Sequence, residues 1–133
     1  MSEIRPDDLA PPAANYAHAV LSEGVTRWLH TSGVVPVAPD GSTPEPIGEQ
    51  ADVVWMNLAA MLRDAEMGVD DIVSVTTYVV ADGTTDLADD LAAVMAARDV
   101  ALGGHRAAST LVTVPALARP QWRMEIAVVA AVS

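Results

Sequence analysis

Residues 121–132, QWRMEIAVVAAV, carry the pattern that decides the fold. From residue 124 to residue 132 every position except Glu125 is apolar. The run is much shorter than the roughly 20 apolar residues that a membrane-spanning helix needs. A short continuous apolar run instead predicts a strand that is buried on both faces. We therefore expect this strand to lie in the middle of a β-sheet, and we expect no membrane partner.

The segments upstream supply neighbours for that strand. Residues 71–80, DIVSVTTYVV, are rich in β-branched side chains and predict a second long strand. Shorter extended segments are predicted at residues 15–21, 25–31, 34–37 and 108–114. Apolar residues at helical spacing predict two helices, one over residues 49–67 and one from Thr84 or Thr85 to the Gly103-Gly104 pair.

This order of elements predicts a single α+β domain over residues 1–133, with a mixed β-sheet and two helices packed on one face. The polar, proline-containing residues 1–14 are expected to form an irregular N-terminal arm. Since two helices can cover only one face of the sheet, we expect the other face to contact further copies of the chain.

Composition narrows the choice of partners. The chain has 7 Lys+Arg, none of them Lys, against 18 Asp+Glu, and its formal net charge is −11. Nucleic-acid binders neutralise phosphates with clustered basic side chains, so a nucleic-acid partner is not expected. No Cys is present and the three His lack ligand spacing, so we expect no metal site. The first residues, MSEIRPDD, lack the basic and apolar regions of a signal peptide, which predicts a cytoplasmic location.

Glu125 is the residue most informative about chemistry. An isolated carboxylate buried in an apolar strand costs several kcal/mol, so a buried Glu125 would need a partner or a raised pKa. A carboxylate tuned in this way is a candidate general acid or base. Alternatively, Glu125 faces an edge, where it is solvated or pairs with Arg123 two residues earlier. The residues themselves leave both interpretations open.

Three other positions are candidates for ligand binding. Arg106 ends a Gly-Gly-His-Arg loop, where a guanidinium could capture a carboxylate, or could simply be solvated. The hydroxyl of Tyr16 could orient a small ligand, or could remain in water while the ring packs. The Ser32-Gly33 pair could present backbone N–H groups to an anion, although most such pairs are plain turns.

Segments along nearly the whole chain resemble motifs of the Rid family, also called the YjgF-type or endoribonuclease L-PSP-like family. Residues 15–20, NYAHAV, resemble the family's G-P-Y-S-x-A-V, and residues 29–36, LHTSGVVP, resemble [VI]-x-[TV]-S-G-Q-[IV]-P. Residues 109–117, STLVTVPAL, resemble R-S-T-V-x-V-x-x-L, and residues 124–130, MEIAVVA, resemble [IV]-E-I-E-A-[IV]-A. All four occur in the family's order.

The resemblance implies a chorismate-mutase-like fold and a homotrimer with clefts between subunits. It also implies hydrolysis of reactive enamines or imines, such as 2-aminoacrylate, to carbonyl compounds and ammonia, without a metal or an organic cofactor. In the family a Glu on the last strand positions or activates water, while an Arg holds the substrate carboxylate. The resemblance thus makes Glu125 catalytic, and our candidate substrate-binding residues are Tyr16, Ser32, Gly33, Arg106, Ser109 and Thr110.

One departure from the family pattern bears on the chemistry. An ungapped match puts Ser109 at the position of the family's carboxylate-binding Arg. In an extended chain Arg106 is about 10 Å away and on the opposite strand face, so it could substitute only if its loop bends back. Val34 stands where the family has Gln. Two functions therefore stay open, a Rid-type deaminase and a Rid-type trimer that binds a different small molecule or acts as a regulator.

Overall fold

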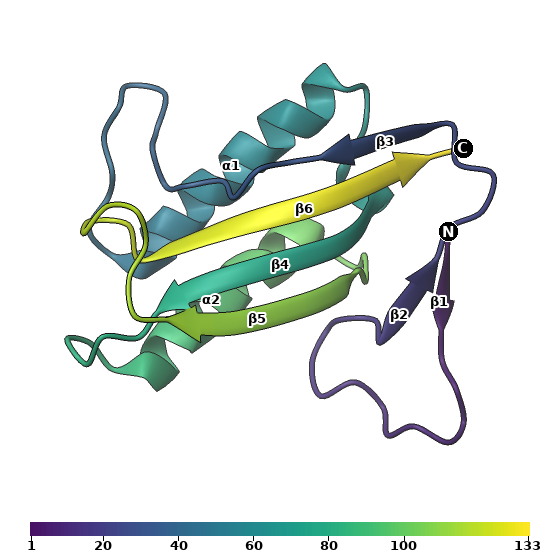
Figure 1. Ribbon diagram of the computed structural model, residues 1–133, viewed down its shortest axis with the longest axis horizontal. Helices are drawn as coiled ribbons and strands as arrows, with labels where there is room; N and C mark the ends of the chain where they lie inside the picture. Colours follow the sequence, from purple (N-terminus) through teal and green to yellow (C-terminus); the bar gives the residue numbers. More distant parts are fainter.

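The computed structural model describes residues 1–133, and the apolar C-terminal segment forms an interior strand, β6 (Met124–Val132). β6 lies between β3 (Arg27–His30) and β4 (Ile72–Val80), and β5 (Ala108–Val114) completes the order β3-β6-β4-β5 (Figure 1). β6 is antiparallel to both of its neighbours, whereas β4 and β5 are parallel. The expected mixed sheet with a central C-terminal strand is confirmed.

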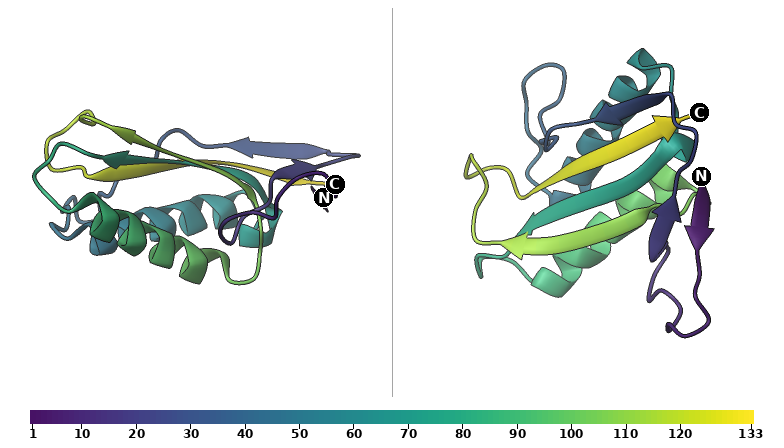
Figure 2. Two further views of the ribbon diagram at one scale, coloured as in Figure 1. Left: turned by 90° about the horizontal axis from the view of Figure 1, so that it is seen from below. Right: turned by 45° about the vertical axis from the view of Figure 1, so that its right-hand side comes forward.

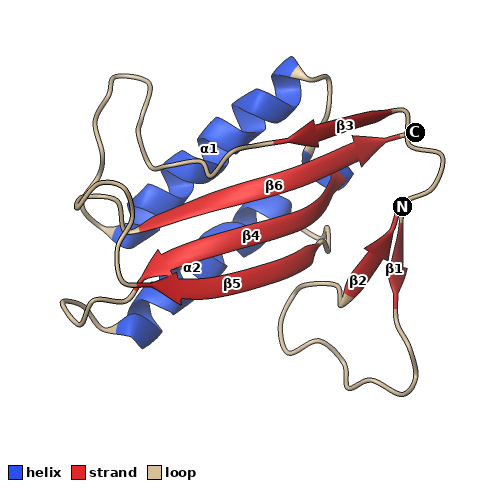
Figure 3. Ribbon diagram, in the orientation of Figure 1, coloured by secondary structure: helices blue, strands red, loops and turns tan.

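Helices α1 (Ile47–Asp64) and α2 (Leu87–Leu102) pack on the same face of this sheet (Figure 2, left, and Figure 3). Alternate residues of β6 point into the layer between sheet and helices and are buried, namely Met124, Ile126, Val128 and Ala130. Glu125, Ala127 and Val129 point to the opposite side, which we call the uncovered face. The predicted α+β domain with helices on one face is therefore confirmed.

Local signals explain where the helices begin and end. Pro46, in an extended conformation, precedes α1, and Glu49 in the first turn complements the helix dipole. The Asp86 carboxylate accepts a 3.0 Å hydrogen bond from the Asp89 N–H and caps α2, which ends at Gly103 with φ 60°. The 3-10 turn η1 (Val69–Asp71) leads into β4. Neither helix has the length and apolarity to cross a bilayer.

The beginning of the chain differs from the expectation. Strand β1 (Ser2–Ile4) pairs antiparallel with β2 (Ala19–Leu21) beside the main sheet, so the prediction that residues 1–14 are irregular throughout was wrong at its start (Figure 1). The predicted strand at 15–21 shortens to β2, and the predicted segment at 34–37 reduces to a single bridge between Val34 and Ile126. These pairings join residues far apart in sequence, which local patterns do not report.

Candidate functional site

The uncovered face presents Glu125 beside the Ser32-Gly33 segment. The backbone of Val34 exchanges hydrogen bonds of 2.7 and 3.1 Å with that of Ile126, which brings the segment after β3 alongside β6. A Cβ placed on Gly33 would overlap the Glu125 carboxylate, so only glycine leaves room for this side chain. On the other side of Glu125, Tyr78 of β4 is its cross-strand neighbour. The structure thus brings together Gly33 and Glu125, two of the residues singled out by the sequence.

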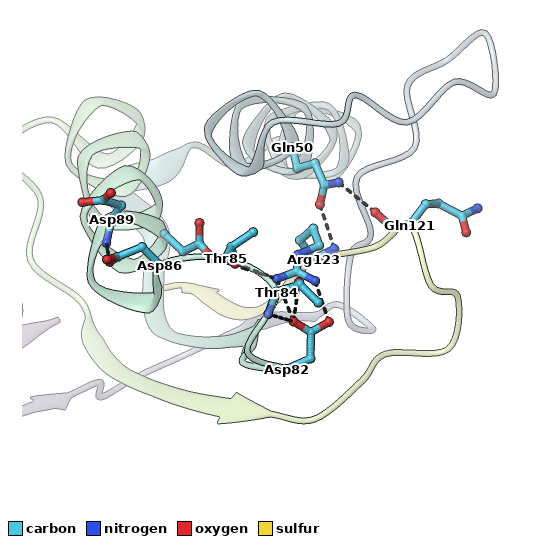
Figure 4. Close-up of polar contacts among 9 residues, drawn as sticks. Gln50, Asp82, Thr84, Thr85, Asp86, Asp89, Gln121 and Arg123 are labelled. Atoms are coloured by element: carbon cyan, nitrogen blue, oxygen red, sulfur yellow. Dashed lines mark hydrogen bonds and ion pairs between the residues drawn. The ribbon is translucent and has the colours of Figure 1, made fainter.

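Glu125 has no partner within the chain. The predicted alternative, an ion pair with Arg123, does not form, because the Arg123 guanidinium donates to Asp82 at 2.9 Å and to Thr85 at 3.0 Å (Figure 4). The hydrogen bond from Thr84 and the interaction with Arg123 together hold the pKa of Asp82 well below its usual range. The Glu125 carboxylate therefore remains available to water or to a ligand on the uncovered face.

A buried amide fixes the backbone that leads into Glu125. Gln50 of α1 is 1% exposed. Its Nε2 donates to the carbonyl oxygens of Pro44 at 2.9 Å and Gln121 at 2.8 Å. Its Oε1 accepts from the N–H of Arg123 at 2.8 Å, and Figure 4 shows the contacts with Gln121 and Arg123. Gln50 thus connects the start of β6 to α1, and the Arg123 side chain connects it to the loop after β4. Gln50 is not among the candidate residues predicted from the sequence, although a glutamine among apolar residues of a helix is a signal that could have marked it.

A second group of candidates lies at the other edge of the sheet. Tyr16 and Ser109 line a hollow of about 340 Å³, here called the β5-edge hollow, together with Leu91, Met95, Arg98 and Leu111. Ser109 pairs in register with the buried Val75 and faces α2, whereas Thr110 is exposed and points to the uncovered face. Adjacent positions of β5 thus present Ser109 and Thr110 to opposite sides.

Arg106 is engaged by the N-terminal strand. Its Nε and Nη2 contact the two carboxylate oxygens of Glu3 at 3.0 and 3.3 Å, and Nη2 also donates to the Tyr16 carbonyl at 2.5 Å. Hydrogen bonds from Arg5 and Arg106 lower the pKa of Glu3 to about 2. A substrate carboxylate would have to displace Glu3 in order to use Arg106.

Within one chain the two groups do not meet. In the strand order β3-β6-β4-β5 (Figure 1), β4 separates β6 from β5. Glu125 and Gly33 lie on the β3–β6 side, whereas the hollow lies at the β5 edge. A site that uses both groups would need the β5 edge of one copy beside the uncovered face of another. The described residues contain no cluster of three His, Cys, Asp or Glu side chains that could hold a metal ion.

The fold and the sequence can be compared with known proteins. The family model described as Endoribonuclease L-PSP matches residues 8–132. The crystal structure of YyfB from Yersinia pestis, a Rid-family protein of unknown function, is 30% identical, with a TM-score of 0.84 and 98% of each chain covered. Escherichia coli TdcF, solved with bound serine, is 25% identical, with a TM-score of 0.70 and all of each chain covered. No curated protein matches the chain.

Proposed function

Because the chain belongs to the Rid family, whose model is described as Endoribonuclease L-PSP, we propose that it hydrolyses reactive enamines or imines to carbonyl compounds and ammonia. The observation that carries the proposal is the unpaired Glu125 carboxylate, set against Gly33 on the uncovered face. A carboxylate held in place without an internal partner can orient a water molecule and accept its proton. The proposal involves no cofactor.

The chemistry balances without an external reagent. An enamine first tautomerises to its imine by gaining a proton at carbon and losing one at nitrogen. Water then adds to the imine carbon, its oxygen forming a bond to that carbon, while Glu125 accepts one water proton and passes it to the nitrogen. In the resulting carbinolamine the hydroxyl proton passes through Glu125 to the nitrogen, and ammonia leaves as the C–N bond breaks and the C=O bond forms. An imine plus water thus becomes a carbonyl compound plus ammonia, and Glu125 ends in its starting protonation state.

The uncovered face supports assembly into a homotrimer as part of the proposal. Trp28 of β3 is 53% exposed and Val112 of β5 is 40% exposed, and both side chains lie on this face. Trp28 is the cross-strand neighbour of Ala131, and Val112 is that of Tyr78. An exposed apolar face of this kind favours burial against other subunits. Packing of the β5 edge of one subunit beside Glu125 of the next would unite the two groups of candidate residues in one cleft.

The ligand proposed for this cleft is small. Serine bound to the Rid-fold protein TdcF supports an amino-acid-sized molecule. Tyr16, Ser32, Gly33, Ser109 and Thr110 keep their proposed roles as residues that line the cleft. A cytoplasmic location stays a prediction of the sequence.

A second function is favoured by one observation. The Nε and Nη2 of Arg106 are already engaged by Glu3 and Tyr16, and the ungapped sequence match puts Ser109 at the position of the family's carboxylate-binding Arg. A trimer that binds a different small molecule, or serves as a regulator, would need no strong carboxylate clamp. This alternative predicts ligand-dependent stabilisation without turnover.

The deciding experiment measures ammonia and pyruvate release from freshly generated 2-aminoacrylate. We expect the wild type to accelerate release over buffer and Glu125→Gln to lose roughly 10²-fold or more of this acceleration. Glu23→Gln, at an exposed glutamate in the turn before β3, is the matched control. No acceleration by the wild type would reject the deaminase function and leave the binding alternative.

A further inference from the structure

Arg98 places a guanidinium in the layer between α2 and the sheet. The residue is 5% exposed and lies seven positions after Leu91 on α2. Its one carboxylate partner is Asp99, contacted at 3.3 Å from Nε and 3.1 Å from Nη2, and the Asp99 side chain is 50% exposed. Nη1 makes no hydrogen bond within the chain. A buried guanidinium with a single, largely solvated partner is poorly compensated and retains donors for an anion.

The surroundings of Arg98 have the composition of a small-molecule site. Arg98 lines the β5-edge hollow of about 340 Å³ together with the side chains of Tyr16 and Ser109. Three apolar side chains complete the wall, namely Leu91, Met95 and Leu111. A mostly apolar wall with a few convergent polar groups is typical of ligand pockets. The hollow suits a molecule of amino-acid size that carries one negative group.

The other arginines are engaged or lie elsewhere. The Nε and Nη2 of Arg106 are engaged by Glu3 and the Tyr16 carbonyl, and Arg106 does not line the hollow. Arg123 is held by Asp82 and Thr85 in the network of Figure 4. The remaining four arginines do not line the hollow. Arg98 is thus the guanidinium that combines burial, a free donor and a place in the wall of the hollow that Ser109 lines.

We propose that Arg98 binds the substrate carboxylate in this chain and takes the role of the arginine whose position Ser109 holds in the ungapped sequence match. The short Ser109 side chain leaves the hollow open to a guanidinium that comes from α2. The planar fork of Arg98 offers Nη1 to a carboxylate, which can also displace the exposed Asp99. This inference rests on the proposed function for the class of substrate, a small imine or enamine with a carboxylate.

A binding experiment tests Arg98 without requiring turnover. Pyruvate, the carbonyl product of 2-aminoacrylate hydrolysis, is titrated by calorimetry against pyruvamide, which has a neutral amide in place of the carboxylate. We expect the wild type to prefer pyruvate. Arg98→Met should weaken pyruvate binding at least roughly tenfold and leave pyruvamide binding unchanged. Arg63→Met, at an exposed arginine of α1, should behave as the wild type.

Several results would overturn the proposal. One is that Arg98→Met binds pyruvate as tightly as the wild type does. Another is that the wild type does not bind pyruvate. A third is that Arg106→Met loses pyruvate binding while Arg98→Met retains it. If Arg98→Met does not fold, the wild type still provides a test. Pyruvate should shift the Nε–Hε NMR signal of Arg98, and an unchanged Arg98 signal at saturation contradicts the proposal.

Turnover measured in parallel separates this inference from the proposed function. Ammonia release that survives Arg98→Met would leave the deaminase function standing and would reject Arg98 as the clamp. Arg98-dependent pyruvate binding without any release of ammonia would keep the clamp and reject the deaminase function.

Discussion

Gly33 and Glu125 lie in contact although 92 positions separate them in sequence, and the Glu125 carboxylate occupies the space that a side chain at residue 33 would need. The contact exists because the Val34 backbone pairs with Ile126, which sets the segment after β3 diagonally across from Glu125. Glycine at residue 33 thereby determines where the proposed catalytic carboxylate can lie.

Substitution of this glycine should misplace the carboxylate. In Gly33→Ala the new methyl group would push Glu125 aside, and a displacement on the order of 1 Å can cost about 10²-fold in rate. We expect this loss in ammonia release from 2-aminoacrylate while the far-ultraviolet circular dichroism stays unchanged. Gly68→Ala is the control, because a methyl group there meets nothing within 4 Å. Full activity of Gly33→Ala would show that the position of Glu125 does not matter.

The assembly should depend on the uncovered face. Light scattering of the wild type should give three times the mass of the 13.9 kDa chain. Val112→Lys places a charge on that face and should yield monomers, because an unpaired buried ammonium is costly. Val100→Lys, on α2 and 84% exposed in the wild type, should stay trimeric. A monomeric wild type would contradict the intersubunit cleft.

The buried amide of Gln50 should contribute to stability. Gln50→Leu removes the partner of the Arg123 N–H and of two carbonyl oxygens, and each unpaired buried group costs about 1–3 kcal/mol. We expect urea unfolding to report a loss of about 3 kcal/mol in the free energy of unfolding. Gln121→Leu keeps the carbonyl that Gln50 uses and should change stability by less than about 0.5 kcal/mol. Equal stability of the two variants would mean that the amide is dispensable.

Acid should release the N-terminal strand. Hydrogen bonds from Arg5 and Arg106 lower the pKa of Glu3 from its ordinary value of 4.5 to about 2 in the folded state. A lowered pKa stabilises the fold fully above pH 4.5, and this contribution is lost as the pH falls toward 2. Amide hydrogen exchange of β1 and β2 should therefore lose protection across this range. In Glu3→Gln the exchange protection of these amides at pH 6 should be lower than in the wild type and nearly independent of pH. If the variant instead loses protection with pH as the wild type does, Glu3 is not the cause.

Much of the fold could be predicted from local patterns. The apolar run that became β6, the β-branched run that became β4 and the spacing of apolar residues in both helices each report burial along one segment. The prediction that residues 1–14 are irregular was wrong at residues 2–4, because β1 forms by pairing with β2, for example Glu3 with Val20. Pairing across distance depends on register, and a local pattern carries little information about it.

The candidate site divides in the same way. The sequence marked Glu125 as a carboxylate in an apolar strand, but the choice between Arg123 and no partner required the position of Asp82. Arg98 went unnoticed, although it interrupts the Ala-rich apolar sequence of α2. Its burial in the wall of the hollow that Ser109 also lines follows from the packing of α2 against the sheet, which the helical period by itself does not specify.

By itself, the sequence determined the element types, the central place of the last strand and the candidate carboxylate Glu125, because each depends on the pattern of apolar residues along one segment of the chain. Only the tertiary structure decided that Gly33 lies against Glu125, that the Glu3 carboxylate binds the Arg106 guanidinium and that Arg98 lines a hollow with Ser109. Such contacts join distant segments, and the strand register and helix packing that create them are properties of the whole fold.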